Sequence, residues 1–178
     1  LPILNNSGLP ASEDFCSNVL NPRVANEMIT PYKAFFRKEI PASEAEAFRK
    51  NPQALVELCK KEITINNELN SQRIPMSPMG VWKARVADEK SRNIFFVSMA
   101  RSLGIPAWID EVTGKIQYRT FNDNNLKNGK VYDVDFEAAQ QTQASTGTLV
   151  ARYRPIPSLS DPKYYSHFTR SEEHTSEL

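Results

Sequence analysis

The chain has 178 residues, of which 40% are hydrophobic and 24% are charged, and its formal net charge is +1 at pH 7. This composition is typical of one globular domain of about 150 residues with some additional material. The near-neutral charge gives no support for a nucleic-acid partner, and no apolar stretch reaches the roughly 20 residues needed to cross a bilayer, so no membrane span is expected in this fragment.

Both ends of the sequence indicate a fragment of a longer protein. The chain starts at Leu1 inside a loop-like stretch, and no signal-peptide pattern follows. At the other end, Arg170–Leu178 resembles the translation of a widely used sequencing adapter, and a short charged tail of this kind has nothing to pack against. We therefore expect residues 170–178 to be an artefactual tail outside the fold.

The N-terminal part of the sequence predicts a series of helices. Asn21-Pro22 is a cap residue followed by proline at the first helical position, and apolar residues recur at helical spacing over Val24–Glu39. Pro31 lies inside this run and should kink or divide the helix near Thr30.

Two further helices are expected before the centre of the chain. The stretch Ser43–Glu46 is a capping-box pattern that opens a short helix through Lys50. Asn51-Pro52 repeats the arrangement of a cap followed by proline, and a one-sided apolar stripe then continues to about Ile65. These patterns make the first part of the fold helical.

A buried central helix follows an extended connector at Arg73–Gly80, which contains two prolines. Asp88 is a good N-cap, because its carboxylate can accept from the backbone N–H groups of the first turn. Ile94–Ala100 is apolar around nearly the whole helix, which is typical of a buried helix. Gly104 and Pro106 predict where the helix ends.

Beyond this helix the apolar period changes to that of strands, and four strands are predicted, at Pro106–Val112, Lys115–Phe121, Lys130–Phe136 and Thr148–Arg154. Thr113-Gly114 favours a tight turn and an antiparallel hairpin between the first two. Gln140–Thr146 is polar and is expected to be a linker or an exposed turn. Helices followed by an antiparallel sheet indicate an α+β fold.

The end of the central helix carries a family resemblance. Arg101–Ala107 reads Arg-Ser-Leu-Gly-Ile-Pro-Ala and resembles the helix end of the transglutaminase-like superfamily, which has a papain-like fold. Gly129–Asp135 is similar to the family strand that ends in the catalytic aspartate, so the resemblance spans about Asn51–Glu137. Within it, Pro78–Tyr118 looks like a bacterial subgroup found in larger exported proteins, which implies a periplasmic or cell-surface location.

The resemblance also implies a domain organisation, and the expected segments are a truncated helical part at 1–50, a transglutaminase-like core at 51–140, a linker with the start of a following β module at 141–169, and the tail at 170–178.

The family's chemistry needs a cysteine at the start of the core helix, a histidine on the second strand and an aspartate on the third. Here the cysteine's place falls at Glu89, and no histidine precedes His167. Asp135 matches the aspartate, with Asp133 as a competitor. Ser91 lies two residues past the nucleophile's place and would need a strong base that is not nearby. We therefore expect no catalytic residues, no metal and no cofactor, with Glu89 and Asp135 as degenerate positions.

A vestigial cleft could still bind a ligand, and the candidate residues are Asp88, Arg101, Trp108, Tyr118 and Asp133. Each has a structural interpretation as well. Asp88 is a helix cap, and Arg101 either binds a carboxylate, such as Asp110 or Asp135, or is a surface arginine. Trp108 suits either stacking on a sugar or core packing in its strand.

The two cysteines, Cys16 and Cys59, form neither a metal-ligand spacing nor a CxxC motif. Cys59 falls on an amphipathic helix and is expected in the core, while a disulfide between the two remains open. The predicted function is a catalytically degenerate module of a larger bacterial protein, serving a structural role or binding peptide or glycan. The alternative is an active thiol-dependent acyltransferase or amidase, in which Cys16 or Cys59 reaches the cleft.

Overall fold

The computed structural model describes residues 15–120, 129–138 and 142–143, which belong to one compact unit spanning Leu1–Ala144. The predicted strand Thr148–Arg154, the tail at 170–178 and both histidines lie outside the described residues. The same holds for the module expected at 141–169, apart from residues 142–143, so these expectations stay predictions.

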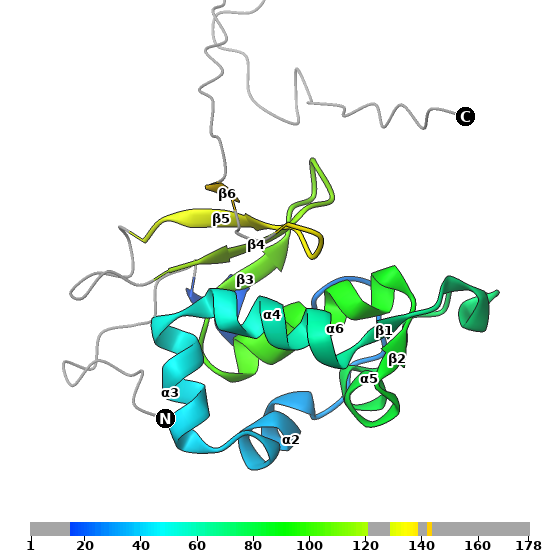
Figure 1. Ribbon diagram of the computed structural model, residues 1–178, viewed down its shortest axis with the longest axis horizontal. Helices are drawn as coiled ribbons and strands as arrows, with labels where there is room; N and C mark the ends of the chain where they lie inside the picture. Colours follow the sequence, from blue (N-terminus) through cyan, green and yellow to red (C-terminus); the bar gives the residue numbers. More distant parts are fainter. Residues whose placement is uncertain (1–14, 121–128, 139–141, 144–178) are drawn as a thin grey trace, which may run out of the picture. The chain divides into compact units, whose positions relative to one another are not determined.

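The central helix α6 (Glu89–Ser102) lies between helices and an antiparallel sheet (Figure 1). Helices α2 (Tyr32–Glu39) and α5 (Pro78–Ala84) pack on one side of α6, and the sheet lies on the other. Helix α4 (Pro52–Glu62) also packs on α6 and carries α3 (Ala42–Lys50) beside it. The predicted α+β class is therefore correct at the level of mixed helices and antiparallel sheet.

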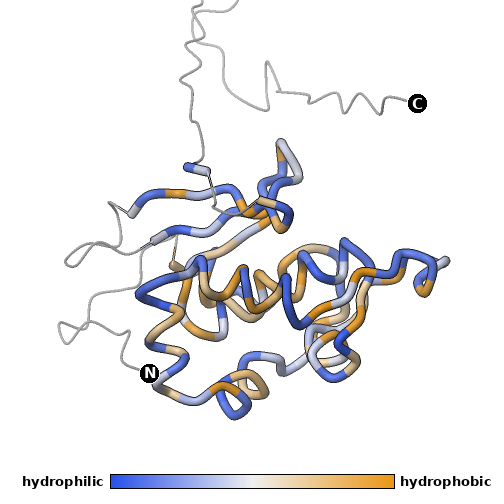
Figure 2. The backbone as a smooth tube through the Cα atoms, in the orientation of Figure 1, coloured by the Kyte–Doolittle hydropathy of each residue, from blue (hydrophilic) through white to orange (hydrophobic). Residues whose placement is uncertain are grey.

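Helix α6 forms as the sequence predicts. Asp88 caps it, because its Oδ1 accepts from the backbone N–H of Ser91 at 3.0 Å. Every residue from Ile94 to Ser102 is buried, which agrees with the apolar stretch along this helix in Figure 2. Gly104 follows in the left-handed region with φ of +84°, a conformation that glycine adopts without steric cost.

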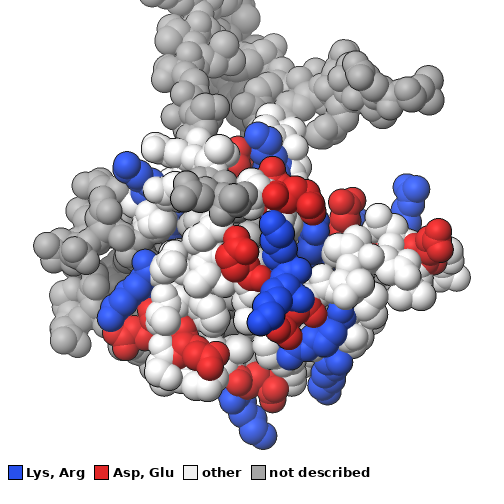
Figure 3. Space-filling view, viewed as in Figure 1, with Lys and Arg blue, Asp and Glu red and all other residues white. Residues whose placement is uncertain are grey.

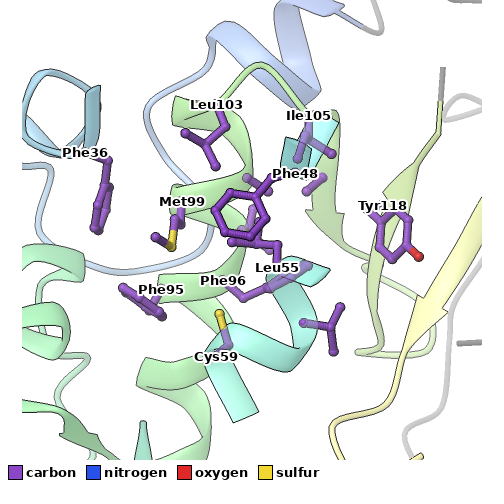
Figure 4. Packing of buried hydrophobic residues seen from close by; sticks show 14 of the residues in the cluster. Phe36, Phe48, Leu55, Cys59, Phe95, Phe96, Met99, Leu103, Ile105 and Tyr118 are labelled. Atoms are coloured by element: carbon purple, nitrogen blue, oxygen red, sulfur yellow. The ribbon is translucent and has the colours of Figure 1, made fainter. Parts of the chain in front are cut away.

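The core combines aliphatic side chains with aromatic rings, several of which meet edge to face around α6 (Figure 4). Phe36 of α2 lies 5.7 Å from Phe95 and 6.1 Å from Trp82, with steep interplanar angles of 70° and 85°. On the other side, Phe96 meets Phe136 at 5.9 Å. Because Phe36 comes from the segment at 1–50, that segment shares one core with the helix and the sheet.

The sheet has the strand order β3 (Ala107–Ile109), β4 (Ile116–Arg119), β5 (Val131–Val134) and β6 (Thr142–Gln143), and all its pairs are antiparallel. The first three strands were predicted, although each is shorter than expected. The turn between β3 and β4 is closed by Asp110, whose Oδ1 accepts from the backbone of Val112 and Thr113, and Gly114 has φ of +69°. Strand β6 falls in the segment expected to be a linker or turn.

The helix predicted from Asn21-Pro22 is wrong, because α2 begins only at Tyr32. The carboxylate of Glu27 accepts from the backbone N–H groups of Val24 and Ala25, both at 2.8 Å. This local bonding gives the backbone an alternative to helical hydrogen bonds. Pro31, expected to kink or divide a longer helix, instead stands immediately before its first residue.

Three other local features differ from the sequence prediction. The Ser43–Glu46 capping box does not form, since α3 starts at Ala42 after Pro41 without a side-chain cap bond. After α4 the chain leaves the helix for β1 (Thr64–Ile65), which pairs in parallel with β2 (Val86–Ala87). The expected connector at Arg73–Gly80 contains the start of α5, which Ser77 caps by accepting from Gly80 N–H.

Two short irregular helices complete the described part, η1 (Cys16–Leu20) and η2 (Asn67–Asn70).

Substituting Phe36→Ala tests whether the N-terminal segment belongs to the core. Phe36 is fully buried, so its loss should reduce the free energy of unfolding by about 3 to 5 kcal/mol, measured by urea denaturation. Phe35→Ala is the matched control, since Phe35 is only partly buried at the edge of the same core. Equal costs for the two substitutions would contradict a shared core.

Candidate functional site

A cleft of ≈ 380 Å³ opens where the start of α6 meets the β4 and β5 strands. Its charged lining comes from three places in the sequence, namely Glu89 and Arg92 on α6, Lys115 before β4, and Asp133, Asp135 and Glu137 on and after β5. Four of these side chains are acidic and two are basic. We call this hollow the α6 cleft. Elsewhere the two signs intermingle on the described surface in the view of Figure 3.

Asp133 is held on the sheet by one residue on β4 and one residue immediately before it. Its Oδ2 accepts from Lys115 Nζ at 3.0 Å, and its Oδ1 accepts from Gln117 Nε2 at 2.7 Å. The register explains the second contact, because Gln117 and Asp133 are directly paired across the antiparallel strands. Asp135 is exposed and its Oδ1 accepts from Glu137 N–H at 2.8 Å, which shapes the turn after β5.

Arg92 occupies the helix side of the α6 cleft, one turn after Glu89. Its guanidinium carbon lies 4.1 Å from the centroid of the Phe136 ring, an arrangement that favours a cation over the ring face. Burial lowers the pKa of Arg92, whereas the nearby carboxylates of Glu89, Glu137 and Asp135 oppose that shift. Arginine remains protonated, so the cleft contains a fixed cation among acidic groups.

Asp88 and Ser91 have structural roles beside the cleft and do not line it. Asp88 Oδ2 accepts from the Ser91 hydroxyl at 2.5 Å and from Asn70 Nδ2 at 2.7 Å. Ser91 is fully buried, and its Oγ also accepts from Met76 N–H at 2.9 Å. These bonds join the segment before α5 to the start of α6, and they leave the Ser91 hydroxyl engaged rather than poised as a nucleophile.

Arg101 is neither a surface arginine nor a ligand of Asp110 or Asp135, so both expectations are wrong. It is 4% exposed and donates from Nε to Ala107 O at 2.8 Å. Its Nη1 donates to Asn21 O at 3.1 Å and to Arg23 O at 2.7 Å. Burial lowers the pKa of Arg101, while Tyr32 and Glu27 oppose the shift. The guanidinium thus ties the chain before α2 to α6 and β3.

The aromatic candidates also lie away from the α6 cleft. Tyr118 is buried and stacks on Tyr132 at 5.5 Å, and burial followed by the neighbouring Tyr132 raises the pKa of Tyr118 to about 12. Trp108 is half-buried on β3, with the Arg119 guanidinium 5.6 Å from its ring. Of the five predicted binding residues, only Asp133 lines the cleft, together with the degenerate positions Glu89 and Asp135.

Three charged residues of the cleft were not among the sequence candidates, namely Arg92, Lys115 and Glu137. The signal for Arg92 was its spacing of one helical turn from Glu89, which places both on one helix face. Lys115 could not be identified from the sequence alone, because the sequence does not determine the register of β4 and β5. That register brings Lys115 to Asp133.

The two cysteines are not joined to each other, since Cys16 lies at the surface and Cys59 is buried in the core. Burial raises the pKa of the Cys59 thiol well above its usual range, which opposes formation of a thiolate. No cysteine or histidine is found among the described residues that line the α6 cleft. The described lining of this cleft therefore supplies neither a thiol nor an imidazole.

Within residues 15–120, 129–138 and 142–143, the acidic, cysteine and histidine side chains form no group of three or more suited to a metal ion. The helices of the same ranges include none with the length and apolarity to span a membrane.

Comparison with known proteins assigns no family to the chain. No protein-family model matches it, and no match is found among curated proteins or solved structures. The function must therefore be argued from the geometry of the α6 cleft.

The Asp88 cap predicts a dependence of stability on pH. Burial alone would raise the pKa of Asp88, but hydrogen bonds from Ser91 and Asn70 outweigh it and hold the pKa below its ordinary range. A carboxylate with a lowered folded pKa stabilises the fold fully above its unfolded pKa of about 3.9, and this contribution is lost as pH falls through the folded pKa.

We therefore expect Asp88→Asn to unfold more easily than the parent from pH 7 to 5, with the difference shrinking below about pH 4. Urea denaturation at successive pH values measures the difference in the free energy of unfolding. Glu44→Gln, at an exposed position in the first turn of α3, should show almost no difference. A gap between parent and Asp88→Asn that does not change with pH would contradict this role.

The cysteine environments predict different reactivity. Iodoacetamide at neutral pH should alkylate Cys16 in the folded chain and leave Cys59 unmodified until urea unfolds the protein. Peptide mass spectrometry measures the modification at each site. Rapid alkylation of Cys59 in the folded protein would contradict its burial and would support the thiol-enzyme alternative.

Proposed function

We propose that this chain is a catalytically degenerate transglutaminase-like domain that acts as a binding module of a larger exported bacterial protein. The supporting observation is the meeting of Glu89, Lys115 and Asp133 around one cleft. They come from the start of the central helix, the edge of the second strand and the third strand, in that chain order. In the transglutaminase-like superfamily the nucleophile, the base and the orienting aspartate lie on these three elements. The resemblance implies Asp135, which also lines the cleft, as the match to the aspartate, with Asp133 as its competitor.

The chemistry at these places favours binding over catalysis. A carboxylate at Glu89 is a poor nucleophile for acyl transfer, and the ammonium of Lys115 is paired with Asp133 at 3.0 Å. This ion pair is partly exposed, since the Lys115 side chain is 60% accessible, so it contributes little to stability. Because Lys115 is the exposed partner, a basic ligand can replace it at the Asp133 carboxylate, which is itself 17% exposed.

The charge of the α6 cleft favours a peptide that carries a basic side chain. Four carboxylates and two cations leave an excess of two negative charges, which complement a lysine or arginine. Asn93 and Thr142 add hydrogen-bonding groups for a peptide backbone.

The residues that line the α6 cleft are less suited to binding a glycan. Phe136 is its one aromatic ring among the described residues, and that ring is buried with Arg92 over its face. Sugars stack on exposed ring faces, and Trp108 lies outside the cleft. We therefore place the peptide first and treat the glycan as the competing ligand.

Titration of the amide NMR spectrum tests the peptide proposal. Trilysine should shift the resonances of Glu89, Asn93 and Asp133, whereas triglutamate should not, because the cleft is negatively charged. The double substitution Glu89→Gln/Glu137→Gln should weaken the binding of trilysine severalfold. The matched control is Glu44→Gln/Glu57→Gln, which removes the same charge from exposed positions on α3 and α4.

Chitotriose provides the third arm of the titration. Shifts at the α6 cleft with chitotriose but not with trilysine would replace the peptide by a glycan. If neither ligand shifts the cleft, the binding proposal fails and only a structural role remains.

A further inference from the structure

A second cavity lies at the other end of α6, between α2, α3 and η1, and has a volume of ≈ 240 Å³. Its wall is mostly apolar, with Phe15, Val19, Ile40 and Leu103 among the lining residues. It shares no lining residue with the α6 cleft. We call it the basic cavity, because four cationic side chains also reach it.

These cations are Lys33 and Arg37 of α2, Arg49 of α3 and Arg101 of α6, and none of the described residues that line the cavity is acidic. Lys33 Nζ donates to Val19 O at 2.6 Å and to Leu20 O at 2.5 Å. Carbonyl groups satisfy such a donor but do not neutralise its charge. Burial, and then repulsion by Arg101 and Arg37, lowers the pKa of Lys33 to about 8. The cavity therefore holds a concentrated positive charge.

Arg49 carries a buried hydrogen-bond donor that has no acceptor. Its Nε is buried, and the structure gives it no hydrogen-bond partner. An unsatisfied buried donor destabilises the fold, and does so more strongly when the group is charged. Arg37, in contrast, is exposed at the rim and carries a charge that can reach a ligand from the solvent side.

We infer that the basic cavity binds a small organic carboxylate with an apolar body, held by Arg37 and Arg49 through its carboxylate and by Phe15, Val19 and Ile40 through its body. Guanidinium groups bind carboxylates through short charge-assisted hydrogen bonds, which would satisfy Arg49. The volume is below the roughly 300 to 1,000 Å³ of sites for drug-sized ligands, so the ligand is compact, as a medium-chain fatty acid is. This site is independent of the proposed function of the α6 cleft.

Isothermal titration calorimetry of the 178-residue chain tests the inference with three ligands. Octanoate should bind with one-to-one stoichiometry below its micellar concentration. Octanol has the same apolar body without the charge, and inorganic phosphate has charge without the body. Octanol should bind at least about tenfold more weakly, because it cannot form charge-assisted hydrogen bonds with the guanidinium groups. Phosphate should also bind at least about tenfold more weakly, because it has no apolar body to bury against the cavity wall.

Substitutions identify the binding residues. Arg37→Gln and Arg49→Gln should each weaken octanoate binding about tenfold. Lys38→Gln removes the same charge from an exposed neighbour that does not line the cavity, and it should leave the affinity unchanged. Circular dichroism checks that each variant is folded, and Arg37→Gln serves as the test if Arg49→Gln is not, because Arg37 is exposed.

Three results would overturn the inference: octanol binding as tightly as octanoate, phosphate binding as tightly as octanoate, or arginine variants that behave like Lys38→Gln. The Glu89→Gln/Glu137→Gln variant should bind octanoate normally. A failure of peptide binding at the α6 cleft is thereby distinguished from a failure at the basic cavity.

Discussion

Burial of α6 on all sides determines how the other elements are arranged. A helix that is apolar around its circumference needs cover on every face, and the aromatic rings of Phe36, Phe95 and Phe96 provide contacts in both directions. The sides of α6 are consequently occupied by packing. Its two ends are the places where polar groups gather, with the α6 cleft at the first turn and the basic cavity at the last.

Charge inside the fold is accommodated by backbone groups more than by ion pairs. Arg101 donates to three carbonyls from two separate parts of the chain, and Glu27 accepts from two backbone N–H groups. Such bonds satisfy the side chain and fix an irregular segment at the same time. They also leave net positive charge near Lys33, where carbonyl oxygens are the partners and no lining residue that the structure describes is acidic.

Features set by local chemistry were predictable, and features set by distant contacts were not. The cap at Asp88 and the stop at Gly104 follow from the residues themselves, so α6 was placed correctly. The missing helix before Tyr32 depends on a carboxylate that bonds to backbone groups, a choice that helical spacing does not reveal. In the same way, the role of Arg101 depends on carbonyl groups that lie 80 and 78 residues away in the sequence. Lys115 entered the candidate site only through strand register, whereas Glu89 and Asp133 were identified from sequence.

The parallel pairing of β1 with β2 has a consequence for how related sequences can vary. It brings Thr64 beside Val86, so the chain between them leaves and returns at one point. The cost of closing a loop rises only slowly with its length. Residues 71–74 are exposed between the contacts of Asn70 and Met76 with the start of α6, so an insertion there would disturb the local hydrogen bonds of Asn70 with Ile74 rather than the helix. Extra residues in this loop would not displace α6, around which the domain is packed.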